Sequence, residues 1–266
     1  MPAVEWNFYP SVVIGVIALG AAYLYAIGPF RRIIPDSQAV RPANSISFLL
    51  GLAIMFLALT SPLDALSDEY LFSAHMVQHT LLTLVVPPLL LAGTPGWLVE
   101  VIFRNSMIRR FFRVITNPLI AFSLYNLVFA LWHLPTAYEA ALDNEAIHVI
   151  EHLSFISSAV LFWWPILSTS TSIPALTYPR QILYLFLSSI PCTILGGVFV
   201  FAPKVIYPKY SSAPLLFSGL NPMTDQQIGG VIMAMAGMFI FLGFLGRSFY
   251  LWYNHSSKQE VSGTQI

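Results

Sequence analysis

The segment Leu71–Ala92, LFSAHMVQHTLLTLVVPPLLLA, contains no Asp, Glu, Lys or Arg. About 20 mostly apolar residues suffice for an α-helix to cross the roughly 30 Å hydrocarbon core of a bilayer. Pro87 and Pro88 lie inside the segment and are expected to distort the helix, because proline lacks a backbone N–H group. The segment therefore predicts a membrane-spanning helix that carries His75 and His79 near its beginning.

The whole chain shares this apolar character. Hydrophobic residues make up 57% of the sequence and charged residues 9%, and the mean hydropathy is +0.73. Soluble domains carry about 25% charged residues. The 12 basic and 12 acidic residues balance, and there is no basic excess of the kind that nucleic-acid-binding proteins show. The composition predicts a membrane protein and no nucleic-acid partner.

Charged residues separate seven apolar segments, which predict an all-α polytopic membrane protein with seven transmembrane helices. The helices are expected at Ser11–Phe30, Ser45–Thr60, Leu71–Ala92, Pro118–Trp132, Ala146–Leu167, between Arg180 and Lys204, and between Asp225 and Arg247. We treat residues 1–266 as a single membrane domain with a short polar tail at 253–266. The only cysteine, Cys192, allows no intramolecular disulfide.

The distribution of Lys and Arg predicts the orientation in the membrane. Ten of the twelve basic residues fall in the loops after the first, third and fifth helices and in the C-terminal tail, and only Lys204 and Lys209 fall on the other side. Basic loops stay in the cytoplasm. We therefore expect the N-terminus outside and the C-terminus in the cytoplasm.

Five of the six histidines are expected at the outer ends of three helices: His75, His79, His133, His148 and His152. The motifs HMVQH and HVIEH each space two histidines by four residues, which places both rings on one face of a helix. A histidine inside a membrane is costly without a partner or a role. The sixth, His255, lies in the tail.

Imidazole nitrogen binds Cu, Zn, Fe and Ni, and the thioether of methionine favours Cu(I). The sequence predicts a metal site, most consistent with Cu(I), at these five histidines. We expect Met76, Glu151, Met223 and Asp225 in auxiliary positions around it, with carboxylates orienting the imidazoles. Asp225 opens the last helix, where an acidic residue can also simply cap the helix. Gly229 and Gly230 are expected to allow close contact between helices.

Five stretches together resemble one family. HMVQH, PPLLLAGTP, LWHLP, HVIEH and DQQIGG are similar to the CtaG family of multi-span bacterial cytochrome c oxidase assembly factors, over about residues 61–252. The resemblance implies a plasma-membrane protein that handles copper for a haem–copper oxidase, with oxidase subunits, membrane lipid and an external copper donor as partners. It also implies that the chain is not an enzyme.

Three alternatives stay open. Paired histidines could hold haem b in a redox protein, although two histidines on one helix face cannot ligate the two sides of one haem. A metal transporter would need polar groups through the middle of the membrane, which most of the predicted helices do not offer. HVIEH also has the spacing of an HxxEH zinc-peptidase motif, but the chain offers no outer soluble domain to hold a peptide.

Overall fold

The computed structural model describes residues 5–35, 37–216 and 219–263, and the side chains of that part up to residue 257. The described chain is helical and contains no strand. The elements are α1 (Pro10–Ile27), η1 (Phe30–Ile33), α2 (Pro42–Thr60), α3 (Pro62–Glu69), α4 (Phe72–Thr80), η2 (Leu81–Val85), α5 (Val86–Gly93), α6 (Gly96–Phe103), α7 (Ser106–Ile115), α8 (Pro118–Trp132), α9 (Pro135–Asp143), α10 (Glu145–Leu167), α11 (Tyr178–Phe201), α12 (Pro208–Ser212) and α13 (Pro222–Gly263).

Six helical segments are long and apolar enough to cross a membrane: Pro10–Ile33, Pro42–Thr60, Phe72–Gly93, Glu145–Leu167, Tyr178–Phe201 and Pro222–Ser257. A seventh span exists if α7 and α8, which meet at a bend of 65°, are taken together. The prediction of an all-α polytopic protein is confirmed. The expected fourth helix coincides with α8, but α8 alone has only 15 residues and needs α7 to complete a span.

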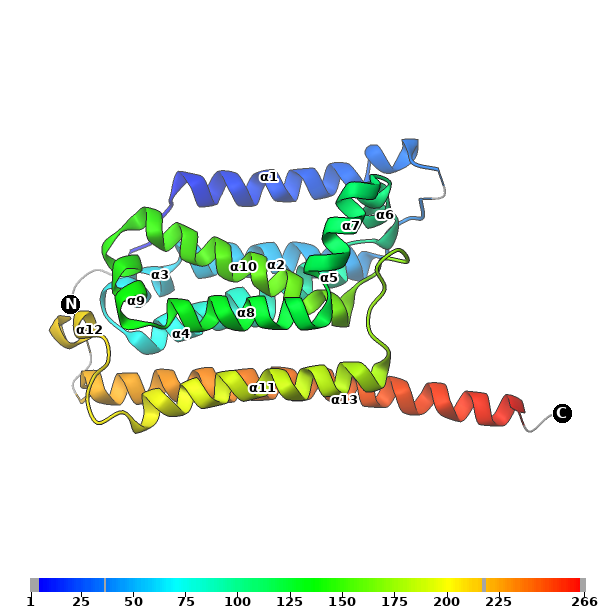
Figure 1. The fold of residues 1–266 in the computed structure, drawn as a ribbon. Coiled ribbons are helices and arrows are strands. Elements are labelled where there is room, and N and C mark those ends of the chain that lie inside the picture. Colours follow the sequence, from blue (N-terminus) through cyan, green and yellow to red (C-terminus); the bar gives the residue numbers. More distant parts are fainter. Residues whose placement is uncertain (1–4, 36, 217–218, 264–266) are drawn as a thin grey trace.

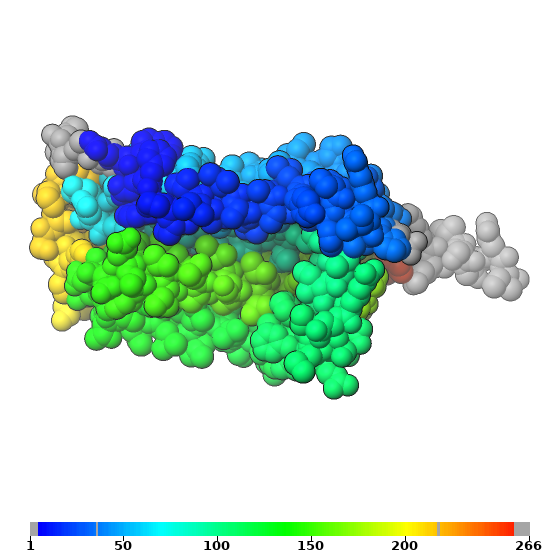
Figure 2. All heavy atoms as spheres, turned by 90° about the horizontal axis from the view of Figure 1, so that it is seen from above, coloured from blue at the N-terminus to red at the C-terminus, as the bar shows by residue number. Residues whose placement is uncertain are grey.

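The long helices lie side by side (Figure 1). Helix α1 forms one edge and runs across the face seen in Figure 2, and Tyr23 is its only buried residue. Helices α11 and α13 form the opposite layer. They approach closely where a Cβ on Gly196 would meet the carbonyl oxygen of Gly230 at 2.6 Å, which bears out the packing role expected for Gly230.

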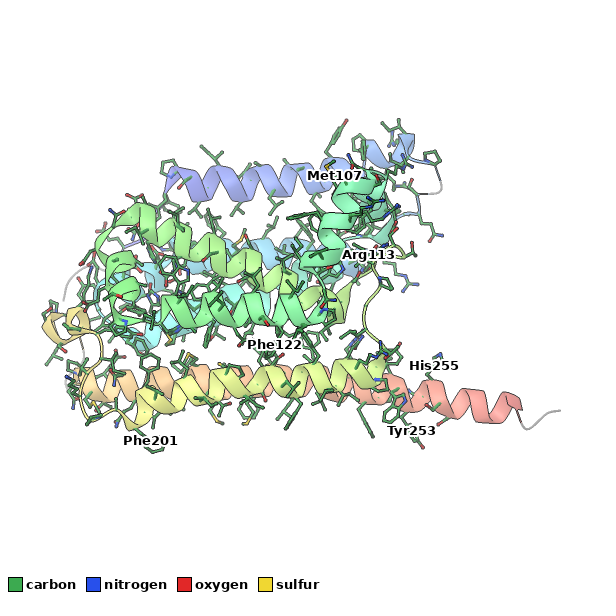
Figure 3. All side chains as sticks on the ribbon, in the orientation of Figure 1. Met107, Arg113, Phe122, Phe201, Tyr253 and His255 are labelled. Carbon is green, nitrogen blue, oxygen red and sulfur yellow. The ribbon has the colours of Figure 1, made fainter. Side chains whose placement is uncertain are left out.

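The short helices gather at the two ends of the bundle. Helices α3, α9 and α12 lie at one end, and α6 and α7 lie at the other (Figure 1). Apolar side chains on the long helices point outward, as Phe201 and Tyr253 do in Figure 3. These two side chains are 85% and 64% exposed. Such exposure suits a lipid surrounding, in which apolar side chains need no burial within the protein.

A π-helical turn, η2, ends at Val85, two residues before the first of the two prolines in the third span. Pro87 has no N–H group to bond the carbonyl of Thr83, four residues earlier. The indole N–H of Trp163 donates to that carbonyl instead, at 3.0 Å. The helix therefore continues through the prolines to Gly93, because a neighbouring helix satisfies the freed backbone oxygen.

Candidate metal centre

The structure brings five histidines together at the end of the bundle that holds α3, α9 and α12. His75 and His79 lie on α4, His133 follows the last residue of α8, and His148 and His152 lie on α10. The distances between ring centroids are 4.1 Å for His75–His79, 4.2 Å for His148–His152, 5.5 Å for His79–His152, 6.2 Å for His75–His148 and 6.3 Å for His79–His133. His255 lies at the other end of the molecule (Figure 3).

Local sequence determines how each pair is presented. Residues four apart in an α-helix lie on one face, and this spacing sets both 4 Å pairs. Helix α10 begins at Glu145 because the Asn144 side chain caps it, accepting hydrogen bonds from the N–H groups of Ala146 and Ile147 at 3.0 and 3.2 Å. The cap places His148 in the first turn of α10, so the second pair lies at the end of the bundle.

The cluster is buried, yet much of its hydrogen-bonding capacity is unused. His75 is fully buried, and His79, His133 and His152 are at most 8% exposed. Buried polar groups in proteins are nearly always hydrogen-bonded. Here the following atoms have no partner within the described part of the chain: Nδ1 and Nε2 of His75 and His79, Nε2 of His133, His148 and His152, and both carboxylate oxygens of Glu151.

Glu151 lies between the two histidine pairs. Its Oε1 is 3.7 Å from Nε2 of His79, and its Oε2 is 4.0 Å from Nε2 of His148. Two sets of potential ligands share it: His75, His79 and Glu151 form one, and His148, Glu151 and His152 form the other. Within each set the ligand atoms lie within 4.8 Å of one another. Both sets therefore have the donor chemistry and the spacing of transition-metal ligands.

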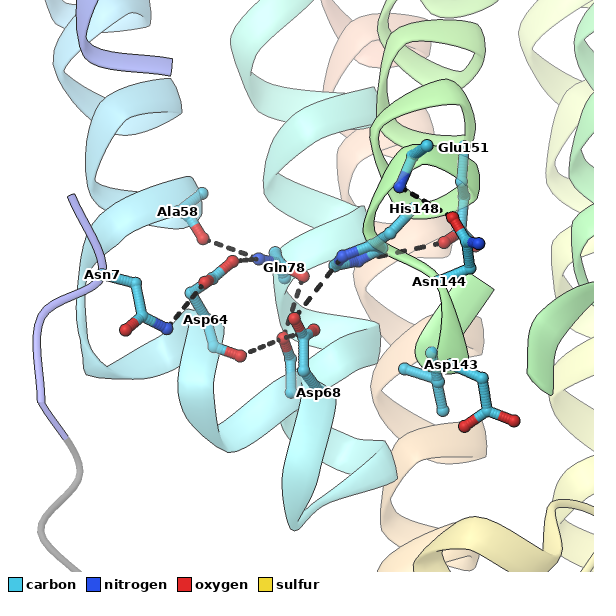
Figure 4. Close-up of polar contacts among 12 residues, drawn as sticks. Asn7, Ala58, Asp64, Asp68, Gln78, Asp143, Asn144, His148 and Glu151 are labelled. Carbon is cyan, nitrogen blue, oxygen red and sulfur yellow. Dashed lines mark hydrogen bonds and ion pairs between the residues drawn. The ribbon is translucent and has the colours of Figure 1, made fainter. Parts of the chain in front are cut away.

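A network of acidic and amide side chains on α3 and α4 borders the cluster (Figure 4). The Gln78 amide donates to Asp64 at 2.9 Å, and Asp68 lies 3.5 Å from Nδ1 of His148. Burial, reinforced by the charge of Asp68, raises the pKa of Asp64 to about 6, and burial raises the pKa of Asp68 to about 6. Asp68 thus occupies the place of a carboxylate that orients a ligating imidazole through its other nitrogen.

His133 is oriented in a similar way by the backbone. Its Nδ1–H donates to the carbonyl of Phe129 at 2.7 Å, which leaves the lone pair of Nε2 available inside the cluster. His133 belongs to neither of the two three-residue sets. It is therefore a peripheral member of the group, nearest to His79.

Comparison with known proteins gives one family. A family model described as cytochrome c oxidase caa3 assembly factor matches residues 21–255, nearly the whole chain. The chain belongs to the caa3 assembly factor family. No curated protein and no solved structure matches it. Membership agrees with the resemblance found in the sequence. It indicates a role in oxidase assembly, but it does not identify functional residues.

The other residues expected around the site take different positions in this family member. Asp225 accepts hydrogen bonds from the backbone N–H of Phe72 at 2.7 Å and from the Ser73 hydroxyl. It therefore caps α4, the helix that carries His75 and His79, and supports the cluster from a distance. Met76 is buried in an aromatic group with Phe72, and it also lines a small cavity together with His79. Met223 is partly exposed near the beginning of α13.

Two features of the site were not expected from the sequence of this assembly-factor chain. Glu151 was assigned an orienting role, although the structure places it among the potential ligands. Its position three residues after His148, on the same helix face, was the signal that could have revealed this. The ring of Tyr138 packs 4.9 Å from that of His75, and no sequence pattern links α9 to α4.

Proposed function

We propose that this caa3 assembly factor binds copper at the histidine cluster and takes part in supplying it to cytochrome c oxidase during assembly. The observation that carries the proposal is the group of buried imidazole nitrogens and carboxylate oxygens that lack hydrogen-bond partners in the described chain. Burying such groups without partners costs free energy. A bound transition-metal ion would use the same lone pairs as ligands.

The position of the cluster supports delivery rather than permanent storage. His148 keeps 14% of its side chain exposed, and a pocket lined by Tyr9, Asp64, His148 and His152 reaches the cluster from the surface. The distribution of Lys and Arg predicts that this end faces the exterior of the membrane. Copper could therefore enter and leave along a short path bordered by the carboxylate of Asp64, which attracts cations.

The test is the copper content of the detergent-purified protein. Replacing His75 and His79 together with Ala is expected to lower the bound copper, whereas His255→Ala, the control at the other end of the molecule, is expected to leave it unchanged. In cells that make a caa3-type oxidase, the double variant should also reduce the copper content of the purified oxidase. Unchanged copper in both measurements would contradict the proposal.

The visible spectrum of the same preparation separates copper from haem. Phe155 and Tyr138 pack against the rings of His79 and His75, with centroids 4.6 and 4.9 Å away, so side chains occupy space that a porphyrin would need. The expected spectrum therefore has no Soret band. A Soret band with split α bands after reduction would replace the copper proposal with a haem-binding function.

A further inference from the structure

We propose that the cluster is built for two metal ions, bridged by the carboxylate of Glu151. This inference rests on the proposed function, because it concerns the same site. It changes the role of Glu151 from a residue that orients imidazoles to a ligand that both ions share.

The two oxygens of Glu151 face different histidine pairs. Oε1 is nearer to the α4 pair, at 3.7 Å from Nε2 of His79, and Oε2 is nearer to the α10 pair, at 4.0 Å from Nε2 of His148. Metal–nitrogen and metal–oxygen bonds of about 2.0–2.2 Å separate two ligands of one tetrahedral ion by about 3.3–3.6 Å. The observed separations thus require a contraction of only a few tenths of an ångström.

The dimensions of the cluster suit two ions better than one. Each set of potential ligands whose atoms lie within 4.8 Å of one another contains one histidine pair and Glu151, and no such set among the described residues joins imidazoles of both pairs. Two-metal sites in proteins commonly place their ions about 3.5–4 Å apart. Each pair together with one oxygen of Glu151 offers three ligands, so each of the two sets can hold one ion.

The environment of Glu151 shows why this carboxylate is not simply an orienting group. An orienting carboxylate accepts the N–H of a ligating imidazole, as Asp68 is placed to do for His148 at 3.5 Å. Glu151 is completely buried, and neither of its oxygens receives a hydrogen bond from the described chain. A buried carboxylate with an imidazole nitrogen within 4.0 Å of each oxygen can be satisfied on both oxygens by cations.

The two subsites differ in access. The α10 subsite borders the pocket that opens past Asp64 and Tyr9, whereas the α4 subsite contains His75, which is fully buried. An ion arriving from outside therefore meets His148 and His152 first. Carboxylates prefer harder ions than thiolates or thioethers do, so the bridged pair favours divalent ions, and copper(II) is the appropriate probe.

The experiment counts copper(II) retained by the purified full-length protein after dialysis. Wild type is expected to hold two ions per chain, and one is expected for both the His75→Ala, His79→Ala variant and the His148→Ala, His152→Ala variant. Glu151→Gln should hold at most one. Glu100→Gln, which alters a carboxylate at the opposite end of the bundle, is the matched control and should keep two.

Electron paramagnetic resonance of the same samples tests the bridge itself. Two copper(II) ions at this separation should give a half-field signal from the coupled pair, which Glu151→Gln should abolish. Thermal unfolding of each variant checks that the bundle is intact. One ion per wild-type chain, or a half-field signal that persists in Glu151→Gln, would overturn the bridged pair while leaving the copper proposal standing. No bound copper in wild type would overturn both.

Discussion

Glu100 and Glu151 lie at opposite ends of the bundle, and their surroundings are opposite in kind. The carboxylate of Glu100 accepts hydrogen bonds from the Ser170 hydroxyl at 2.6 Å, the N–H groups of Thr171 and Ser172 at 2.9 and 3.0 Å, and the Ser172 hydroxyl at 2.5 Å. Glu151 is more deeply buried and accepts none from the described residues.

The difference separates a structural carboxylate from a candidate ligand. Glu100 fixes the loop before α11 to α6, and its hydrogen-bonding capacity is used up by the protein. Glu151 and the neighbouring imidazoles keep theirs, at a cost in stability that a purely structural role would not justify. An unsatisfied group of this kind indicates a site whose partners come from outside the chain.

The largest expected effect is stabilisation by metal. Each copper ion that binds only the folded state should raise the free energy of unfolding by about 4 kcal/mol when free copper is at 1,000 times its dissociation constant. Thermal unfolding in detergent, with copper and with a chelator, measures the difference. The shift should persist in Glu100→Gln and shrink when His75 and His79 are both replaced with Ala. Equal melting temperatures with copper and with chelator would show that the unsatisfied groups around Glu151 do not bind copper.

Removing the unsatisfied carboxylate should stabilise the metal-free protein. Glu151→Met keeps the length of the side chain, removes a buried polar group without partners, and should raise the free energy of unfolding by about 2 kcal/mol in the presence of chelator. The same change at Glu100 should destabilise the protein, because it leaves four donors without an acceptor. Destabilisation by both substitutions, measured by thermal or denaturant unfolding, would mean that Glu151 already has a structural partner.

The smallest expected effect concerns acid stability at the Glu100 end. Burial acts to raise the pKa of Glu100, but hydrogen bonds from Ser170, Ser172 and Thr171 outweigh it and lower the pKa from 4.5 to about 2. Because this pKa is lower in the folded state, the stabilisation is complete above pH 4.5 and is lost as the pH falls towards 2.

Glu100→Gln should therefore cost about 1 kcal/mol at neutral pH, and the difference from wild type should vanish near pH 2. The comparison requires unfolding curves of both proteins between pH 7 and pH 2. A constant difference across this range would assign the effect to packing rather than to the charge of Glu100.

The sequence predicted those features of the fold and the site that depend on residues close together along the chain. Apolar segments bounded by charges predicted most of the long helices within a few residues, because the membrane imposes their length. The last helix is the exception: it was expected to end before Arg247, but α13 continues through the polar tail to Gly263. The spacing in HMVQH and HVIEH predicted the paired rings, because helix geometry is local. Both inferences depend only on neighbours along the chain.

Contacts between distant segments could not be predicted in this way. Asp225 was expected to act at its own helix or near the metal site, whereas it caps α4, more than 150 residues earlier. Whether Glu151 orients a ligand or is one depends on which groups surround its oxygens, and these come from α4 as well as from α10. Short helices such as α3, α9 and α12 have too few residues for periodicity to identify them.

The π-helical turn Leu81–Val85 has a consequence for the geometry of the third span. A π turn holds about one residue more than an α turn, and each residue of an α-helix advances by about 100° around the axis. The turn therefore sets the angle between the face of α4 that carries the histidines and the face of α5 that contacts α2. The carbonyls of Leu89 and Ala92 on α5 accept hydrogen bonds from the side chains of Ser47 and Asn44 on α2. Deleting one residue from this turn would rotate the histidine-bearing face of α4 away from Glu151, while α5 kept its hydrogen bonds with α2.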